Sequence, residues 1–234
     1  MNNTHAGIVD VFSSVQGEGI FLGAKQVFVR FERCNLKCSY CDEPRDATAE
    51  VYTPPALLEK ILFLEEEKGS HHSVSLTGGE PLCYSDFLAE FLPLLRAKGM
   101  KSYLETNGTL AQELGRIIDL VDIIAMDIKL PSATGAGAFW DAHTEFLKMA
   151  LKKRAFVKVV VTPEVAEEDI EKAIRLVTSC GTNIPFILQP ATLAASTESA
   201  VDKKRLLDYL EMGMRGRLET IKVIPQMHKA WGVK

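Results

Sequence analysis

The sequence predicts an α/β protein that folds as a partial (β/α)6 barrel of the TIM type, and three observations support this fold class. Short β-rich runs alternate with helical runs roughly six times, and a last β-rich run closes the series. Polar or special residues follow each apolar run. No segment of biased composition divides the chain. The alternation implies parallel strands with right-handed crossovers, in one domain over residues 1–234.

The elements can be placed by their periodicity, with the first strand expected at 26–32. Strands are expected where β-branched and aromatic residues cluster: 26–32, 73–79, 101–108, 123–129, 155–163, 184–190 and 220–226. Helices are expected where apolar residues recur every three or four positions: 54–69, 85–99, 110–120, 139–153, 166–181 and 201–213.

The polar residues at the strand ends distinguish a barrel from an open doubly wound sheet, which is the alternative. A barrel gathers its chemistry at the C-terminal ends of many strands, whereas an open sheet uses mainly its switch point. Here polar or special residues end all of the expected strands: Glu32 to Cys34, Thr77 to Glu80, Glu105 to Asn107, Asp127 with Lys129, Thr162, Gln189 with Pro190, and Gln226. This distribution favours the partial barrel.

Composition limits the class of protein. With 47% hydrophobic and 25% charged residues the chain has the composition of a globular protein, and a net charge of −4 argues against a nucleic-acid-binding surface. A small-molecule substrate is therefore expected. The N-terminal residues lack a signal peptide pattern, and no apolar run has the length of a membrane span. We therefore expect a cytoplasmic protein, in which cysteines stay reduced.

Three cysteines, Cys34, Cys38 and Cys41, follow the expected strand 26–32 with the spacing C-x3-C-x2-C. Such a loop can ligate three corners of a cubane iron–sulfur cluster and leave the fourth iron open to a substrate or cosubstrate. Structural zinc is the alternative, but it requires four closed ligands, and no fourth ligand lies at a fitting distance in this segment. Cys83 and Cys180 are isolated and are expected to be buried core residues.

"CNLKCSYC" and "TGGEP", together with the barrel-like alternation, resemble the radical S-adenosylmethionine superfamily. The resemblance implies that the three cysteines hold a [4Fe–4S] cluster whose open iron is chelated by S-adenosylmethionine. It places Gly78, Gly79 and Glu80 along the methionine moiety. The other residues expected near this cofactor are Tyr40, Cys41, Asp42, Glu105, Thr106, Asn107, Asp127, Ile128, Lys129, Gln189 and Pro190.

"FSSVQGEG", Arg30 and "IPQMHK" resemble the 7-carboxy-7-deazaguanine synthase family over nearly the whole chain. That family, a group of carbon–nitrogen lyases in queuosine biosynthesis, converts 6-carboxy-5,6,7,8-tetrahydropterin into 7-carboxy-7-deazaguanine and releases ammonia. The resemblance assigns hydrogen abstraction to a cofactor-derived radical, so no protein residue is predicted to be catalytic. The substrate contacts that it implies are Val15, Gln16, Gly17, Glu18, Arg30 and Thr77.

Two other functions share part of this pattern. An enzyme that activates glycyl-radical enzymes would carry the same cysteine spacing and "TGGEP", but "QGEG" and "PQMHK" argue against it. An iron–sulfur or zinc module that senses redox state is the non-enzymatic alternative. A three-ligand cluster beside many polar strand ends makes that alternative the weaker one. His228 is a candidate site residue, although a single histidine is more often structural.

One position departs from the family pattern. The residue two after the last cluster cysteine is typically a threonine that ligates Mg2+ beside the substrate carboxylate, and here it is Glu43. The Glu43 carboxylate could bind Mg2+ directly or could occupy the place of the metal. The resemblance further implies a homodimer and a flavodoxin or ferredoxin as electron donor.

Overall fold

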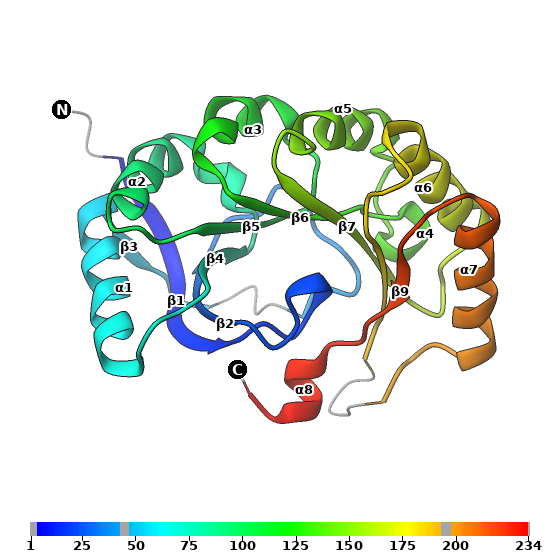
Figure 1. The fold of residues 1–234 in the computed structure, drawn as a ribbon, viewed down its shortest axis with the longest axis horizontal. Coiled ribbons are helices and arrows are strands. Elements are labelled where there is room, and N and C mark those ends of the chain that lie inside the picture. Colours follow the sequence, from blue (N-terminus) through cyan, green and yellow to red (C-terminus); the bar gives the residue numbers. More distant parts are fainter. Residues whose placement is uncertain (1–3, 43–46, 193–197, 234) are drawn as a thin grey trace.

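The computed structural model describes residues 4–42, 47–192 and 198–233. Nine strands form one sheet in the order β3-β1-β2-β4-β5-β6-β7-β8-β9 (Figure 1). Seven of them run parallel as predicted: β2 (Lys25–Phe31), β4 (Ser73–Gly78), β5 (Ser102–Thr106), β6 (Ile123–Asp127), β7 (Arg154–Val161), β8 (Phe186–Pro190) and β9 (Ile221–Val223). The sheet curves without closing, so the architecture is the predicted partial barrel.

Helices cover the outer face of the curved sheet (Figure 1). The long helices fall where the periodicity predicts them: α1 (Pro54–Lys68), α2 (Ser85–Ala97), α3 (Ala111–Ile117), α5 (Trp140–Ala150), α6 (Glu167–Cys180) and α7 (Lys203–Arg215). Each turns an apolar side toward the sheet, as in α2, where Phe87 and Phe91 are buried and stack with ring centroids 5.9 Å apart. Short helices α4 (Pro131–Thr134) and α8 (Met227–Trp231) lie in loops.

The prediction that the first strand lies at 26–32 was wrong, because β1 (Ala6–Val15) precedes it. The short strand β3 (Glu50–Tyr52) was not predicted either. Strand β1 pairs antiparallel with β2 and with β3 at the edge of the sheet. Most of its side chains are only half-buried, so polar residues such as Asp10 and Ser13 interrupt the apolar pattern that marks the central strands. The last expected strand was too long, since β9 ends at Val223.

Apolar side chains close the end of the barrel where the parallel strands begin. Tyr103 of β5, Phe156 of β7 and Ile187 of β8 pack there with Phe21, and the rings of Phe21 and Tyr103 meet edge to face at 5.6 Å. Because this end is filled, space remains only toward the C-terminal ends of the strands. Among the described residues, no helix combines the length and the apolarity that crossing a membrane requires.

Candidate active site

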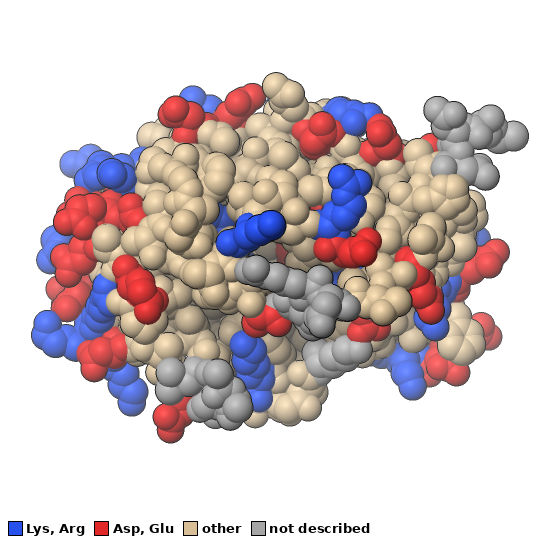
Figure 2. Space-filling view, turned by 180° about the vertical axis from the view of Figure 1, so that it is seen from behind, with Lys and Arg blue, Asp and Glu red and all other residues tan. Residues whose placement is uncertain are grey.

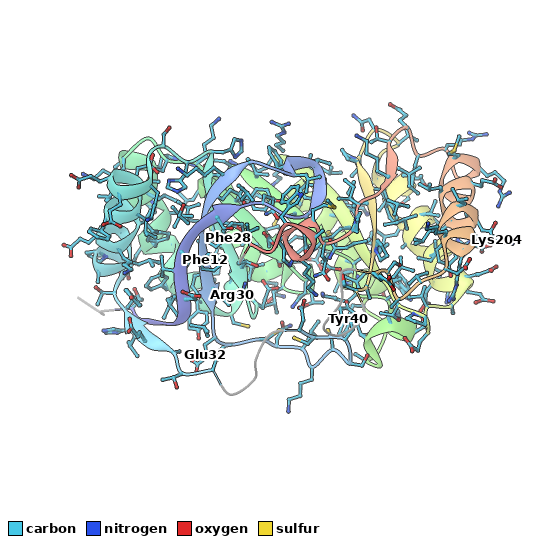
Figure 3. The ribbon with its side chains drawn as sticks, turned by 90° about the horizontal axis from the view of Figure 1, so that it is seen from below. Phe12, Phe28, Arg30, Glu32, Tyr40 and Lys204 are labelled. Atoms are coloured by element: carbon cyan, nitrogen blue, oxygen red, sulfur yellow. The ribbon has the colours of Figure 1, made fainter. Side chains whose placement is uncertain are left out.

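A cavity of about 620 Å³ opens at the C-terminal ends of the strands. It lies where the sequence predicts the chemistry of the protein. Figure 3 shows Phe12, Phe28 and Arg30 together on the side of β1 and β2, with Tyr40 of the cysteine loop farther along. The predicted site residues that line the cavity are Val15, Gln16, Gly17, Glu18, Arg30, Cys34, Cys38, Tyr40, Cys41, Asp42, Thr77, Gly78, Gly79, Glu105, Thr106, Asn107, Asp127, Lys129 and Gln189.

The three cysteines of the loop after β2 are free thiols at this cavity. The loop is held from two sides. The side-chain amide of Asn107 donates to Asn35 Oδ1 over 2.8 Å, and the Ser39 hydroxyl donates to the backbone carbonyl of Ala133 over 2.7 Å. No three acidic, histidine or cysteine side chains of the described residues converge on one ion. A cubane needs no such convergence, because each thiolate binds a different iron, so this donor set fits a [4Fe–4S] cluster.

Gly78 and Gly79 pack against the backbone that leads into the cysteine loop. A Cβ on Gly79 would lie 2.3 Å from the carbonyl oxygen of Arg33, and Gly78 has a φ of +101°, which favours glycine. The Gly79 amide also donates to the carbonyl of Phe31 over 2.8 Å. The two glycines therefore bring β4 against the start of the loop that carries the cysteines.

The Glu80 carboxylate is fully buried behind the cavity wall and does not line the cavity, although it was expected beside the methionine moiety. It accepts hydrogen bonds from the Thr106 hydroxyl (2.8 Å) and from the backbone amides of Asn107 (2.7 Å) and Leu82 (3.1 Å). Burial raises the pKa of Glu80 to about 7, although these donors favour the ionised form. The structure thus gives Glu80 the role of fixing the end of β5.

Two more predicted residues face away from the cavity. Ile128 is completely buried in the main core, and Pro190 ends β8 with its side chain buried. Both were included because they neighbour polar strand-end residues, and in a strand neighbouring side chains point to opposite faces. Glu43, the expected magnesium ligand, lies outside the described residues. Cys83 and Cys180, expected to be buried core residues, are half-buried and pack against the main core.

An ion pair joins the end of β6 to the cysteine loop. Lys129 Nζ lies 2.8 Å from Asp127 Oδ2 and 3.3 Å from the Tyr40 hydroxyl. Burial acts to lower the pKa of Lys129, but the Asp127 carboxylate outweighs it and holds this pKa well above its usual range. Asp127 lines the cavity, and its other oxygen, Oδ1, is buried without a hydrogen-bond partner among the described residues.

A second polar network lies at the side of β4 and β5 and involves Gln16. Its amide donates to Glu105 Oε1 over 2.9 Å, and Glu105 also accepts from the hydroxyls of Ser75 (2.9 Å) and Thr77 (3.3 Å). Oε1 of the Gln16 side chain accepts from the backbone amide of Glu18 over 3.0 Å. These bonds fix the "QGEG" turn at the cavity.

Sequence analysis gave no role to several polar residues that line the cavity, and Lys158 and Gln226 are two of them. Lys158 of β7 forms an ion pair with Glu18, and Gln226 Nε2 donates to the other oxygen of Glu18 over 3.1 Å. A signal for Lys158 was present, since a lysine inside an otherwise apolar parallel strand is costly unless paired. Gln226 was noted as a strand end but was given no role. Its hydrogen-bond partners come from separate parts of the sequence: Glu18, Asp42, Thr192 and Lys229.

The C-terminal helix α8 closes one side of the cavity. The Met227 amide donates to the carbonyl of Gly17 over 3.0 Å, and Lys229 Nζ lies 3.0 Å from Asp42 Oδ2. A Cβ on Gly17 would lie 2.7 Å from the backbone nitrogen of His228, so only glycine allows this close approach. His228 itself lines the cavity, and burial lowers its pKa.

A partial barrel with three cysteines on the loop after its first parallel strand defines a class of enzyme. The sequence profile of the Radical SAM superfamily matches residues 28–177, and the chain belongs to that superfamily, whose members use a [4Fe–4S] cluster and S-adenosylmethionine. Within it the chain belongs to the 7-carboxy-7-deazaguanine synthase family, as two similarities show.

The 7-carboxy-7-deazaguanine synthase of Geobacter sulfurreducens is 41% identical, with 99% of each chain covered. That of Methanothermobacter thermautotrophicus is 35% identical, with 98% of each chain covered. The fold resembles the crystal structure of QueE from Escherichia coli, with a TM-score of 0.64 and 20% identity over 94% of this chain and 93% of that chain.

Proposed function

We propose that the protein converts 6-carboxy-5,6,7,8-tetrahydropterin into 7-carboxy-7-deazaguanine and releases ammonia. The observation that carries this proposal is that the family segments come together in one cavity. Residues 16–18 of "QGEG", Arg30 and Thr77 line the same space as the three cysteines, and the segment after Gln226 closes it. A small-molecule substrate and a reductant follow from the family.

When bound, the cluster and S-adenosylmethionine supply an organic radical that takes hydrogen from C6 of the pterin. The protein binds and orients the substrate and the cofactor, and it excludes water from them. We assign the three cysteines to the cluster and the side of Asn107, Asp127 and Lys129 to S-adenosylmethionine. The buried, unpartnered Asp127 oxygen suits a hydroxyl or ammonium donor of that cofactor.

We assign the opposite side of the cavity to the pterin. Phe12 and Phe28 stack there with ring centroids 5.3 Å apart, and the Arg30 guanidinium carbon lies 6.0 Å from the Phe12 ring centroid (Figure 3). A guanidinium fork suits the carboxylate of the substrate. The Glu18 carboxylate offers an acceptor to the ring edge of the pterin, and the Gln16 side chain offers an amide.

Magnesium is part of the proposal through Glu43. The Glu43 carboxylate would ligate Mg2+ in place of the family's threonine, because a carboxylate without the metal would repel the substrate carboxylate. We expect that the wild type loses activity after exhaustive chelation and regains it with added Mg2+. Glu43→Thr should need a higher Mg2+ concentration. A wild type indifferent to Mg2+, alongside a Thr variant that depends on it, would refute ligation by Glu43.

The remaining partners rest on the family resemblance. We propose a reduced flavodoxin or ferredoxin as electron donor, a homodimer and a cytoplasmic location, with no nucleic-acid or membrane partner. Acidic and basic side chains are interspersed over the face drawn in Figure 2, which agrees with a net charge of −4 and gives little support for binding a polyanion.

Anaerobic reconstitution tests the proposed reaction. The loaded protein is incubated with the carboxypterin, S-adenosylmethionine and a reductant, and the formation of a deazaguanine chromophore and of ammonia is followed. We expect both products in equal amounts. Arg30→Ala should impair turnover far more than binding of S-adenosylmethionine. A fully loaded wild-type protein that leaves the carboxypterin unchanged contradicts the proposed function.

A further inference from the structure

Lys158 projects into the cavity from the middle of an apolar strand. In β7 alternate side chains share a face, so Phe156, Lys158 and Val160 point inward while the valines between them pack in the outer core. Phe156 is part of the apolar end of the barrel, and Val160 lines the cavity. Burying a lysine here is costly unless its charge is paired.

The charge of Lys158 is paired with two carboxylates. Lys158 Nζ contacts Glu18 Oε2 directly and lies 4.0 Å from Asp127 Oδ2. The side chains of Lys158, Glu18 and Asp127 are only 12%, 15% and 9% exposed. Water therefore screens these charges weakly, and each strongly affects the ionisation of the others.

Glu18 is held at both of its oxygens. Lys158 contacts Oε2, and Gln226 Nε2 donates to Oε1 over 3.1 Å. Burial acts to raise the pKa of Glu18, but the Lys158 ammonium, with help from the Gln226 hydrogen bond and from His228, holds this pKa well below its usual range. The other titratable groups near Glu18 are His228, Asp42 and Tyr103, with Asp127 and Glu105 beyond Lys158.

The ring edge of a pterin presents a ring N–H beside an exocyclic amino group. An ionised carboxylate can accept from both donors, whereas a protonated carboxyl group directs one O–H donor at them. Recognition of this edge by Glu18 thus requires a carboxylate that is charged and fixed in orientation.

We propose that Lys158 is a positioning residue that keeps Glu18 ionised and oriented, so that Glu18 accepts both N–H groups of the pterin edge. This inference rests on the proposed function. It gives Lys158 and Lys129 different roles, because Lys129 contacts Tyr40 on the cofactor side while Lys158 contacts Glu18 on the substrate side.

The test measures binding of the carboxypterin by calorimetry, with the cluster and S-adenosylmethionine loaded and no reductant present, so that no turnover occurs. We compare wild type, Lys158→Met and Lys158→Arg between about pH 8.5 and about pH 6. In Lys158→Met the ammonium no longer opposes burial, and although Gln226 still donates to Glu18, the pKa of Glu18 rises. Its affinity should fall up to about tenfold for each pH unit below that pKa. Wild type and Lys158→Arg should lack this additional loss.

Two controls separate positioning from loss of structure. Lys158→Met should keep full cluster content, because the two carboxylates that Lys158 pairs with, Glu18 and Asp127, are not cluster ligands. The double variant Glu18→Gln, Lys158→Met should lose the additional pH dependence, because its amide does not titrate. If Lys158→Met does not fold, Glu18→Gln alone still tests the inference, because it should bind the pterin at least tenfold more weakly than wild type at every pH.

The outcomes distinguish this inference from the proposed function. A loaded wild-type protein that does not bind the carboxypterin contradicts the proposed function and with it the inference. If wild type binds while Lys158→Met follows the same pH profile with the same affinity, only the role of Lys158 is refuted. Wild-type affinity in Glu18→Gln refutes it as well.

Discussion

At the scale of single residues, buried polar side chains fix the strand ends that form the cavity. Glu80 holds the backbone at Asn107, and His143 of α5 reaches the same residue from the helical layer, with Nε2 3.1 Å from the Asn107 carbonyl oxygen. The Lys129 backbone amide also faces this nitrogen, at 3.5 Å, and the shorter contact to the Asn107 carbonyl is a hydrogen bond when Nε2 carries the proton. Two side chains far apart in sequence thus position one loop beside the cysteines.

The cysteines give the first prediction at this scale. Cys34→Ala, Cys38→Ala or Cys41→Ala should each abolish cluster assembly and cleavage of S-adenosylmethionine, because two thiolates cannot hold the site-differentiated cubane. Iron and sulfide analysis after anaerobic reconstitution measures the outcome. Cys180→Ala is the matched control and should keep full cluster content. A full cluster content in any of these three cysteine variants would contradict the assignment of the cysteines as cluster ligands.

His143 gives a pH-dependent prediction. It is fully buried, its Nδ1 has no partner among the described residues, and burial lowers its pKa from 6.5 to about 4. Between these two values the unfolded chain binds a proton that the folded chain does not. The free energy of unfolding therefore falls as pH drops from 6.5 to about 4, by up to about 3 kcal/mol from this residue.

Denaturant unfolding at several pH values measures this effect. In His143→Gln the amide can still donate to Asn107 but does not titrate, so the stability of the variant relative to wild type should improve as pH falls through that window. Contributions of other groups such as Glu80 are common to both chains and cancel. His5→Gln, at an exposed position, is the control. Parallel stability profiles of wild type and His143→Gln would disprove the argument.

At the scale of elements, the parallel strands and long helices could be predicted from periodicity alone, because buried strands and amphipathic helices leave strong patterns. Strand β1 could not be predicted in this way. It lies next to the edge strand β3, and half-buried polar residues such as Asp10 weaken its pattern. Helix α8 could not either, since its five residues dock through backbone contacts with Gly17 rather than through an apolar face.

Docking of α8 gives a prediction at this scale. Gly17→Ala should displace the helix, because the added Cβ would lie 2.7 Å from the backbone nitrogen of His228, and backbone cannot rotate away. Such overpacking typically costs about 1–3 kcal/mol. We expect faster proteolysis of the C-terminal residues and weaker binding of the carboxypterin, with full cluster content.

Gly137→Ala serves as the matched control for α8. A Cβ at Gly137 would meet nothing within 4 Å, so this variant should match wild type in both assays. If α8 of Gly17→Ala resists proteolysis as well as it does in wild type, the close approach at Gly17 does not hold the helix.

At the scale of the whole molecule, one sheet gathers segments from both ends of the chain around one cavity. Gln226 illustrates why much of this site could not be predicted: it donates to Glu18 and Asp42 and accepts from Thr192 and Lys229. Motif spacing predicts residues that lie close together in sequence, such as the cysteines. A residue such as Gln226, which bonds to several segments at once, is brought to its partners only by tertiary packing. The prediction of a single domain over 1–234 stays a prediction.

Binding of the cofactor should stabilise the whole fold. The cavity gathers buried charged groups, including Glu18, Asp127, Lys129 and Lys158, beside polar atoms that lack partners in the described residues. At a concentration of S-adenosylmethionine about 100 times its dissociation constant, linkage predicts about 2.7 kcal/mol of added stability. Anaerobic thermal unfolding measures this as a rise in Tm. Cys38→Ala, without a cluster, should show little rise, and an equal rise there would place binding elsewhere.

The contact between Gly17 and Met227 joins a segment that is synthesised before the cysteine loop to one that is synthesised after all the strands. A ribosome makes the cysteine loop early and α8 last, at about 5–20 residues per second. All strands that form the cavity wall can therefore associate while the side later closed by α8 is still open. We expect a chain halted before Gln226 to present its three thiols at an open barrel mouth, where a cluster-delivery protein has the most room to reach them.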